Sequence, residues 1–207
     1  MSNTPPLPDA HTALPHADPI ALFDGWLAEA LASEPNDPEA MALATATPAG
    51  APSVRMVLLK GHDAAGFVFF TNAQSRKGQE IRANAQAALL FHWKSLRRQI
   101  RIEGDLAEVD AAEADAYFAS RSRLAQLGSA ASDQSRPLPE RQEYLGRVET
   151  LAARYPAGPV PRPPHWTGFR LAPRAIEFWL DREGRLHDRR RYESDGRGGW
   201  SSTLLYP

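Results

Sequence analysis

Cysteine is absent from the 207-residue sequence. Without thiols the chain can form neither a disulfide framework nor a cysteine-ligated zinc site, which excludes the small folds that depend on them. The sequence also lacks any run of about 18 apolar residues, and it has no charged n-region followed by an apolar h-region of the kind a signal peptide carries. We therefore expect no membrane-spanning helix and no secretion signal, and the expected location is the cytoplasm.

An excess of charge of one sign is missing too. Lysine and arginine number 24 against 25 aspartate and glutamate residues, which gives a net charge of -1. Proteins that bind nucleic acid through their bulk charge are typically basic, so we expect no nucleic-acid partner. Hydrophobic residues make up 43% of the chain and charged residues 24%, as in a globular domain with a real core.

The familiar metal and phosphate motifs are absent as well. The six histidines show no ligand spacing, and there is no HExxH sequence, Walker loop or GxGxxG loop. We therefore predict that the protein holds no metal, and that any phosphate it binds is held by other means.

The first residues differ in composition from those that follow. Residues 1–17 are rich in Pro, Ala, Thr and His without periodicity, which predicts a disordered arm. Asp18 followed by Pro19 is a typical helix start, and apolar residues then recur at helical spacing, which predicts a helix over residues 19–32. Residues 18–207 are expected to form a single domain.

Short strand-like segments separated by turns dominate the rest of the chain. This pattern favours an antiparallel barrel or sandwich, so the expected fold is mainly β with peripheral helices, an α+β class. The expected strands are residues 41–47, 53–60, 66–71, 87–93 and 99–109, followed by terminal strands in the last forty residues. The expected helices are residues 75–84, 110–120 and 139–155, whereas 124–136 is predicted to be a functional loop and the proline-rich 156–164 an extended connector.

A pair of cations at the start of one expected helix indicates an anion site. Arg76 and Lys77 follow Ser75 and fill the first turn, where the positive end of the helix dipole normally favours acidic residues. A bound phosphate would gain free backbone N–H groups and both side-chain charges. The alternative is a basic turn that is merely solvated.

Three further places hold candidate ligand-binding side chains. Arg55 and Lys60 lie near the ends of one strand, on opposite faces by alternation, unless this is a core strand whose ends reach solvent. Gln99 lies on a cleanly alternating strand, and its amide can both donate to and accept from the edge of a heterocycle, although an ordinary solvent face has the same pattern. Tyr117 and Arg121, four apart on a helix, suit a flat anionic ligand or form a simple surface cation–π pair.

The sequence RLHDRRRY, residues 185–192, follows an apolar strand-like run and a turn. If it is the returning strand of a hairpin, alternation places Arg185, His187, Arg189 and Arg191 on one face. That face has three guanidiniums, an imidazole and no apolar group. Together with the other cationic places, it indicates more than one bound phosphate.

Seven groups of short sequences together resemble the pyridoxamine 5′-phosphate oxidase family. They occur in the order and spacing of that family, over a stretch from about Asp18 to Pro207, and RLHDR after IEFW is the most specific of them. They are RMVLLK (55–60), FFTN with SRKG (69–78), RRQIRIEG (97–104), YFASR (117–121), SDQS (132–135), IEFW (176–179) and RLHDR (185–189).

The resemblance implies an FMN-binding split β-barrel that works as a homodimer, with two active sites at the interface. It implies oxidation of pyridoxamine 5′-phosphate and pyridoxine 5′-phosphate to pyridoxal 5′-phosphate, by hydride transfer from the substrate C4′ carbon to flavin N5. Oxygen is the implied final acceptor and gives hydrogen peroxide, and the amine substrate also releases ammonia. The implied role is vitamin B6 salvage and biosynthesis.

Transferred position by position, the resemblance also implies which residues bind each ligand. Arg185 and His187 are the implied catalytic residues: Arg185 orients the reacting face, and His187 bonds the ring oxygen or assists proton transfer. The implied FMN-binding residues are Arg55, Met56, Val57, Leu58, Lys60, Phe70, Thr71, Arg76, Lys77, Gln99, Gln134, Ser135, Trp179 and Arg189. The implied substrate-binding residues are Lys60, Tyr117, Arg121, Arg185 and His187.

Three features depart from the family pattern. Ala125 stands where the family has a phosphate-binding serine, a loss of about 1.5–3 kcal/mol if nothing replaces it, and Ser122 and Ser129 are the candidates to replace it. The arm lacks the arginine and tyrosine that help to cover the site in many members, and the arginine close to the terminal proline is missing. The alternatives are a flavin enzyme on the same barrel with a different substrate, a non-catalytic pyridoxal-phosphate-binding protein, and a nucleic-acid binder with a basic patch.

Overall fold

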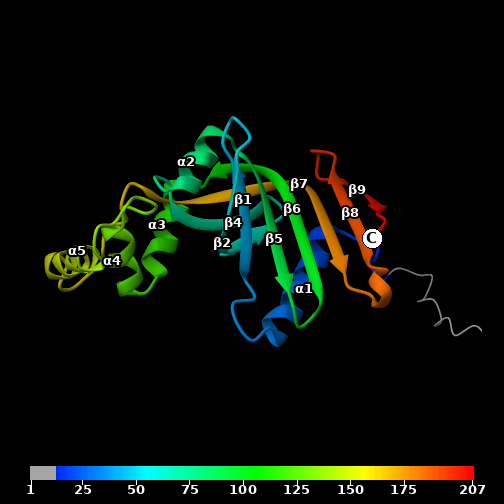
Figure 1. The fold of residues 1–207 in the computed structure, drawn as a ribbon, viewed down its shortest axis with the longest axis horizontal. Helices are drawn as coiled ribbons and strands as arrows, with labels where there is room; N and C mark the ends of the chain where they lie inside the picture. Colours follow the sequence, from blue (N-terminus) through cyan, green and yellow to red (C-terminus); the bar gives the residue numbers. More distant parts are fainter. Residues whose placement is uncertain (1–12) are drawn as a thin grey trace, which may run out of the picture.

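The computed structural model describes residues 13–207 as a curved sheet with helices around it (Figure 1). The helices are α1 (Pro19–Ser33), α2 (Arg76–Ala83), α3 (Ala111–Ser120), α4 (Arg123–Ala131) and α5 (Arg141–Arg154), with a one-turn 3-10 helix η1 (Glu183–Arg185). The strands are β1 (Ala40–Ala46), β2 (Pro52–Leu58), β3 (Gly61–Asp63), β4 (Gly66–Asn72), β5 (Gln86–Trp93), β6 (Arg98–Glu108), β7 (Trp166–Leu180), β8 (Asp188–Ser194) and β9 (Trp200–Leu204). No helix in this part of the chain is long and apolar enough to cross a membrane.

The strands pair antiparallel in the order β2-β1-β5-β6-β7-β4-β3, and β8 and β9 extend the sheet from β7. The long strand β7 pairs with β6 along its length, with β4 through its first half and with β8 through its second half. The register shifts between Glu103 and Gly104, where the sheet curls. A Cβ on Gly104 would lie 2.0 Å from the Ala172 carbonyl oxygen, so the close approach requires glycine. The predicted fold class, mainly β with peripheral helices, is confirmed.

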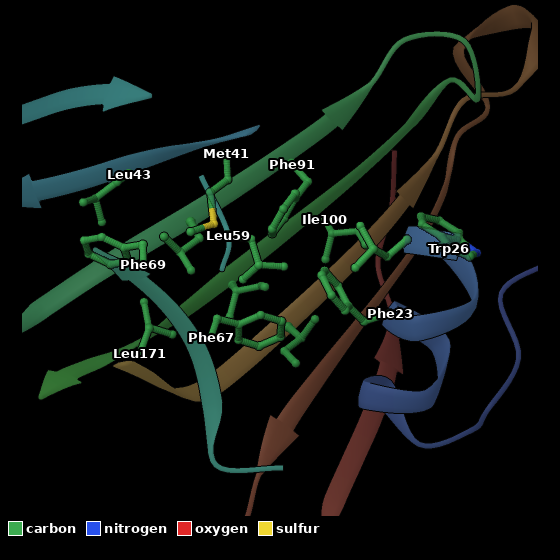
Figure 2. Close-up of a cluster of buried hydrophobic side chains, with 14 of the residues drawn as sticks. Phe23, Trp26, Met41, Leu43, Leu59, Phe67, Phe69, Phe91, Ile100 and Leu171 are labelled. Atoms are coloured by element: carbon green, nitrogen blue, oxygen red, sulfur yellow. The ribbon is translucent and has the colours of Figure 1, made fainter. Parts of the chain in front are cut away.

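Alternation along the strands places apolar side chains on the inner face of the sheet. Figure 2 shows Met41, Phe67 and Phe91 converging there from three strands, and helix α1 lies beside them. Phe23 and Trp26 point from α1 into this cluster, and the Phe23 ring centroid lies 4.9 Å from that of Phe67. Burying each such side chain contributes about 1.5–3 kcal/mol. The opposite, outer face of β2, β1, β5 and β6 does not take part in this core.

Helices α3, α4 and α5 form a separate lobe at one end of the sheet, as Figure 1 shows. The lobe has its own small core of Phe118, Leu127, Val160 and Trp166. Phe70 at the end of β4 packs against this core, so the lobe is anchored to the sheet at that strand.

The predicted functional loop over residues 124–136 is wrong in its first half, because helix α4 lies there. Ser122 caps this helix by accepting a hydrogen bond from the Ala125 amide at 3.4 Å. Three of the five small residues of α4 are alanines, which favour helix rather than loop. Three other helix starts were predicted from their caps, and Asp18, Ser75 and Asp110 all accept the expected backbone hydrogen bonds.

Most of the predicted disordered arm, residues 1–12, lies outside the described residues. Its last part is packed: Leu14 is 1% exposed, and its carbonyl oxygen accepts a hydrogen bond from Arg190 Nε at 3.1 Å. The Pro15 carbonyl oxygen accepts another from the Tyr192 hydroxyl at 2.6 Å. The packed part of the chain therefore begins before the boundary expected at Asp18.

Candidate functional site

A buried carboxylate, Glu80 of α2, organises the cations near the start of that helix. Glu80 is 6% exposed and accepts hydrogen bonds from the hydroxyls of Thr45 and Ser53, each at 2.5 Å. Arg76 Nε donates to it at 2.9 Å and Arg55 Nη2 at 3.2 Å. Burial alone would raise the pKa of Glu80, but the hydrogen bonds from Ser53, Thr45 and Arg76 outweigh it and lower the pKa to about 2. Glu80 is therefore a fixed negative charge that holds two guanidiniums in place.

Lys77, next to this network, has no carboxylate partner among residues 13–207. Its Nζ donates to Gln134 Oε1 at 2.7 Å, and the Thr71 hydroxyl lies 3.4 Å from the same oxygen. Burial, together with the positive charge of Arg55, lowers the pKa of Lys77 to about 8. A desolvated cation beside a second cation gains most from an anion, and a phosphate fits this set of donors.

The backbone of α2 is held close to the strand before it. A Cβ on Gly78 would lie 2.3 Å from the Ala73 carbonyl oxygen, so only glycine allows the first turn of the helix to pack there. This contact fixes the positions of Arg76 and Lys77 relative to the end of β4. The phosphate end of a ligand would therefore find its donors already in place.

Aromatic rings from the sheet and the lobe form a stack beside these cations. The rings of Phe70, Tyr117 and Trp166 lie nearly parallel; the Phe70 centroid is 4.0 Å from that of Tyr117 and 5.3 Å from that of Trp166, and the last two are 6.0 Å apart. Burial raises the pKa of the Tyr117 phenol, Arg121 opposes this, and the nearby Glu39 adds to it. Glu39 also lies 3.7 Å from Lys60 Nζ, so Lys60 and Tyr117 face the same carboxylate.

We call this assembly the inner half-site. Arg121 belongs to it, because Arg121 and Gln134 line one cavity of about 450 Å³, and Gln134 contacts Lys77. Its predicted ligand-binding residues are Arg55, Lys60, Phe70, Thr71, Arg76, Lys77, Tyr117, Arg121 and Gln134.

A second group of predicted residues lies on neighbouring strands of β6, β7 and β8. Gln99 pairs with Trp179, and Trp179 pairs with Arg189, so their side chains stand in one row. They line a cavity of about 170 Å³ together with Glu177. Arg189 bonds Glu177 through Nε at 2.8 Å and Nη2 at 2.7 Å, and it donates to the Tyr206 carbonyl oxygen at 2.9 Å. We call this row, with Arg185 and His187, the outer half-site.

The predicted strand over residues 185–192 is partly wrong, because β8 begins only at Asp188. Gly184 and Arg185 both adopt positive φ, 64° and 62°, which turns the chain before the strand starts. Arg185 and His187 therefore do not continue the strand face of Arg189. A positive φ at a non-glycine residue is strained and marks Arg185 as a candidate functional residue.

His187 nevertheless joins the row through its ring. The imidazole centroid lies 4.5 Å from the Trp179 ring, and His187 Nδ1 lies 2.9 Å from Asp181 Oδ1. This contact leaves Nε2 for a ligand. The guanidinium of Arg185 is exposed and forms no ion pair within residues 13–207.

Arg55 of the inner half-site and Gln99 of the outer half-site lie on opposite faces of the sheet. Register places Arg55 in one row with Leu43, Leu89 and the buried Ile102, on the inner face. Gln99 alternates with these residues and points outward. Strand β6 is three strands from β2, about 14 Å away at the usual spacing. One chain therefore does not bring all the predicted residues together.

The remaining predicted residues lie in the inner core, on the outer face of the sheet or in a turn. Val57 packs against the inner core, whereas Met56 and Leu58 are exposed on the outer face at 62% and 41%. Ser135 is exposed in the turn after α4 and has a φ of 72°. Glu80 was not predicted, although its position four residues after Arg76 is a typical ion-pair spacing. No group of three or more metal-ligating side chains gathers within residues 13–207.

Two family models match the chain. Residues 27–155 match the model described as pyridoxamine 5′-phosphate oxidase, and residues 166–207 match the pyridoxine 5′-phosphate oxidase C-terminal dimerisation region. A protein of Novosphingobium aromaticivorans named pyridoxine/pyridoxamine 5′-phosphate oxidase is 71% identical over 94% of this chain and 96% of its own. One of the same name from Erythrobacter litoralis is 62% identical, over 96% of this chain and 95% of its own.

Solved structures have the same fold. PhzG from Burkholderia lata, in complex with tetrahydrophenazine-1-carboxylic acid, has a TM-score of 0.87 and 37% identity, over 93% of this chain and 94% of its own. An FMN-binding protein related to pyridoxamine 5′-phosphate oxidase, from Nostoc punctiforme, has a TM-score of 0.76 and 20% identity, over 94% of this chain and 99% of its own.

Proposed function

Because the chain belongs to the pyridoxamine 5′-phosphate oxidase family, we propose that it oxidises pyridoxamine 5′-phosphate and pyridoxine 5′-phosphate to pyridoxal 5′-phosphate with FMN as cofactor. Oxygen is the final acceptor and yields hydrogen peroxide, and the amine substrate also releases ammonia. The observation that carries this proposal is the 71% identity, over nearly the whole chain, to a protein that bears the name of this activity. The alternatives of a non-catalytic binder and a nucleic-acid binder have no comparable support.

The inner half-site is the proposed place for the FMN phosphate. Its support is chemical: Arg76 and Lys77 stand at a helix start, Arg55 lies beside them, and one carboxylate, Glu80, offsets only part of their charge. When bound, FMN supplies the acceptor for the hydride that leaves the substrate. The cations and the Thr71 hydroxyl fix the phosphate end of the cofactor by charge and by direction.

The substrate phosphate is assigned to Lys60, Tyr117 and Arg121. The support is that Lys60 and Tyr117 lie near the same carboxylate, Glu39, and that Arg121, which lies near Tyr117, lacks any acidic partner within residues 13–207. Holding both ligands by their phosphates places two flat rings at reacting distance, and such positioning can account for most of the catalysis.

A homodimer is the proposed working form. The C-terminal dimerisation region matched by residues 166–207 supports it. The outer face also carries exposed apolar side chains, with Val54 at 69% and Met56 at 62%, which a second copy would cover. In this arrangement Gln99, Trp179 and Arg189 of one copy complete the inner half-site of the other.

Arg185 and His187 are the proposed catalytic residues, also supplied by the second copy. Arg185 is exposed, unpaired within residues 13–207 and held at positive φ, which suits a side chain that orients a substrate. His187 Nδ1 accepts a hydrogen bond from the Arg182 amide at 3.2 Å and lies 2.9 Å from Asp181 Oδ1, so Nε2 is the atom that would bond the substrate oxygen or move a proton. The cytoplasmic location stays a prediction.

One spectroscopic experiment tests the proposed function. The absorbance spectrum of the purified protein is recorded with FMN, then with pyridoxamine 5′-phosphate under nitrogen, and then in air. A flavin spectrum that bleaches with substrate and returns with oxygen is the expected result. Bleaching by a tetrahydrophenazine carboxylate but not by pyridoxamine 5′-phosphate would instead favour the alternative of a different substrate. A protein that takes up no flavin would contradict the cofactor assignment.

A further inference from the structure

Arg121 is a half-buried cation whose only polar side-chain partner within residues 13–207 is a hydroxyl. Its guanidinium lies over the Trp166 ring at 5.1 Å, and Nη1 donates to Ser129 Oγ at 2.7 Å. Burial lowers the pKa of Arg121, and the nearby Tyr117 opposes this shift. A partly buried guanidinium without a carboxylate partner is stabilised when an anion binds next to it.

The backbone around Arg121 is held firmly. The side chain of Gln126 is buried, and its Nε2 lies 3.0–3.1 Å from the carbonyl oxygens of Phe118, Ala119 and Arg121. These contacts tie the end of α3 to helix α4. The distance between Arg121 and Ser129 is therefore set by the fold and does not depend on an exposed loop.

Ser129 has an unused proton that can bind the same anion. Its oxygen accepts from Arg121, so its own O–H must donate elsewhere, and no acceptor for it lies within residues 13–207. Arg121 and Ser129 line the same cavity of about 450 Å³. A guanidinium and a hydroxyl donor directed into one cavity are a typical pair for a phosphate monoester.

Three other hydroxyl side chains line this cavity, those of Ser122, Ser132 and Tyr144, and the structure shows no hydrogen bond between any of them and Arg121. The Tyr144 hydroxyl donates to the Gly128 carbonyl oxygen at 3.1 Å. Ser122 is exposed and its oxygen caps α4 by accepting from the Ala125 amide. Ala125 has no hydroxyl. It lies four residues before Ser129, about one helical turn, and therefore on the same face of α4. The family pattern has a serine hydroxyl at position 125; in this chain Ser129 offers a hydroxyl one helical turn further along.

We propose that Ser129 is a substrate-phosphate ligand and acts together with Arg121. This inference rests on the proposed function, because it assigns the phosphate of pyridoxamine 5′-phosphate to this cavity. The serine hydroxyl accepts a hydrogen bond from Arg121 and donates one to a phosphate oxygen. The guanidinium and the hydroxyl therefore bind the same phosphate group.

The test compares phosphorylated and unphosphorylated substrates with the FMN-loaded enzyme. For Ser129→Ala, we expect kcat/KM for pyridoxamine 5′-phosphate to fall by about 10-fold to 100-fold, since a hydrogen bond to a charged group is lost. The low kcat/KM for pyridoxamine, which has no phosphate, should stay the same. Ser33→Ala, an exposed serine at the end of α1, is the matched control and should change neither value.

A second variant separates the role of the hydroxyl from the shape of the helix. Adding Ala125→Ser to Ser129→Ala should restore at least part of the lost kcat/KM, because it returns a hydroxyl to the same face of α4. Equal losses for both substrates, or no loss for the phosphorylated one, would overturn the proposal.

Binding of pyridoxal 5′-phosphate, followed by fluorescence quenching, gives a readout that does not need turnover. If the wild type fails to oxidise pyridoxamine 5′-phosphate, the proposed function fails. In that case a weaker affinity of Ser129→Ala for pyridoxal 5′-phosphate still supports the phosphate ligand, and an unchanged affinity still overturns it.

Discussion

The inner and outer half-sites use arginine in different ways. In the inner half-site, Arg55 and Arg76 share the buried Glu80, and Lys77 and Arg121 are left without a carboxylate within residues 13–207. In the outer half-site, Arg189 and Arg101 share Glu177, and Arg101 also pairs with Glu103, so each of these two arginines has a carboxylate partner. The first arrangement has positive charge left over for an anion, whereas the second has little.

The difference indicates that the two half-sites bind different parts of the ligands. A surplus of fixed cations suits the phosphates of cofactor and substrate. A neutralised arginine beside Gln99 and Trp179 suits a flat, mostly uncharged ring, which needs hydrogen bonds and stacking more than charge. Arg185, exposed and unpaired within residues 13–207, is the exception in the outer half-site, and its effect should therefore be on turnover.

The largest effect is expected from Arg185→Ala. Turnover should fall by about 10²-fold, because a misplaced substrate reacts far more slowly, while the enzyme keeps its FMN. Steady-state kinetics and the flavin absorbance of the same preparation measure both quantities. Arg197→Ala, an exposed arginine in the turn between β8 and β9, is the control and should leave both unchanged. Loss of FMN from Arg185→Ala would place this residue in cofactor binding instead.

The next effect concerns the carboxylate that holds the inner half-site together. Glu80→Gln removes the partner of two guanidiniums, so the free energy of unfolding should fall by about 3 kcal/mol at pH 7, measured by urea denaturation of the FMN-free protein. Glu108→Gln is the control, since Glu108 forms an exposed pair with Arg82 that contributes about 1 kcal/mol or less. Similar losses for the two variants would contradict a special role for Glu80.

The pH dependence of this effect has a definite sign. The pKa of Glu80 is lowered to about 2, so its contribution is fully present above the unfolded-state pKa of about 4.3 and is lost as the pH falls through 2. The difference in stability between wild type and Glu80→Gln should therefore shrink between pH 4 and pH 2. A difference that stays constant over that range would show that the charge of Glu80 is not its cause.

The smallest effect is expected from the titration of Lys77. Its pKa is lowered to about 8, so above that pH the FMN-free protein must take up a proton before Lys77 can hold a phosphate. FMN affinity should fall by up to about tenfold per pH unit above pH 8. Lys77→Arg, which stays charged, should flatten this dependence in a fluorescence titration with FMN. An equal slope in both proteins would assign the titration to another group.

Local signals in the sequence predicted the helix starts but not every helix. Asp18, Ser75 and Asp110 were recognised because a capping side chain acts on amides two or three residues away. Helix α4 was mistaken for a loop, because its alanines were read as small rather than as helix-forming. The turn before β8 was missed, since the positive φ of Arg185 has no signal in an arginine.

The residues of the candidate site were predicted as a set, and their arrangement was not. Alternation correctly placed Gln99 opposite Ile100, but the sequence does not say that β6 lies three strands from β2. The split between two faces depends on strand order, which results from long-range pairing. Ser129 was one of two candidates for the missing hydroxyl, and its contact with Arg121 distinguishes it from Ser122, which caps α4.

The account depends on each active site being built from two copies of the chain, and mixing two inactive variants tests this most directly. Arg121→Ala damages the inner half-site and Arg185→Ala the outer one, so each variant alone should have little activity at low substrate concentration. When the two are refolded together, half of the dimers are mixed, and each mixed dimer has one site with both lesions and one with neither. We predict recovery of about a quarter of the wild-type activity. Activity that never exceeds the average of the two variants would contradict the account, because it would place both half-sites of one active site in a single chain.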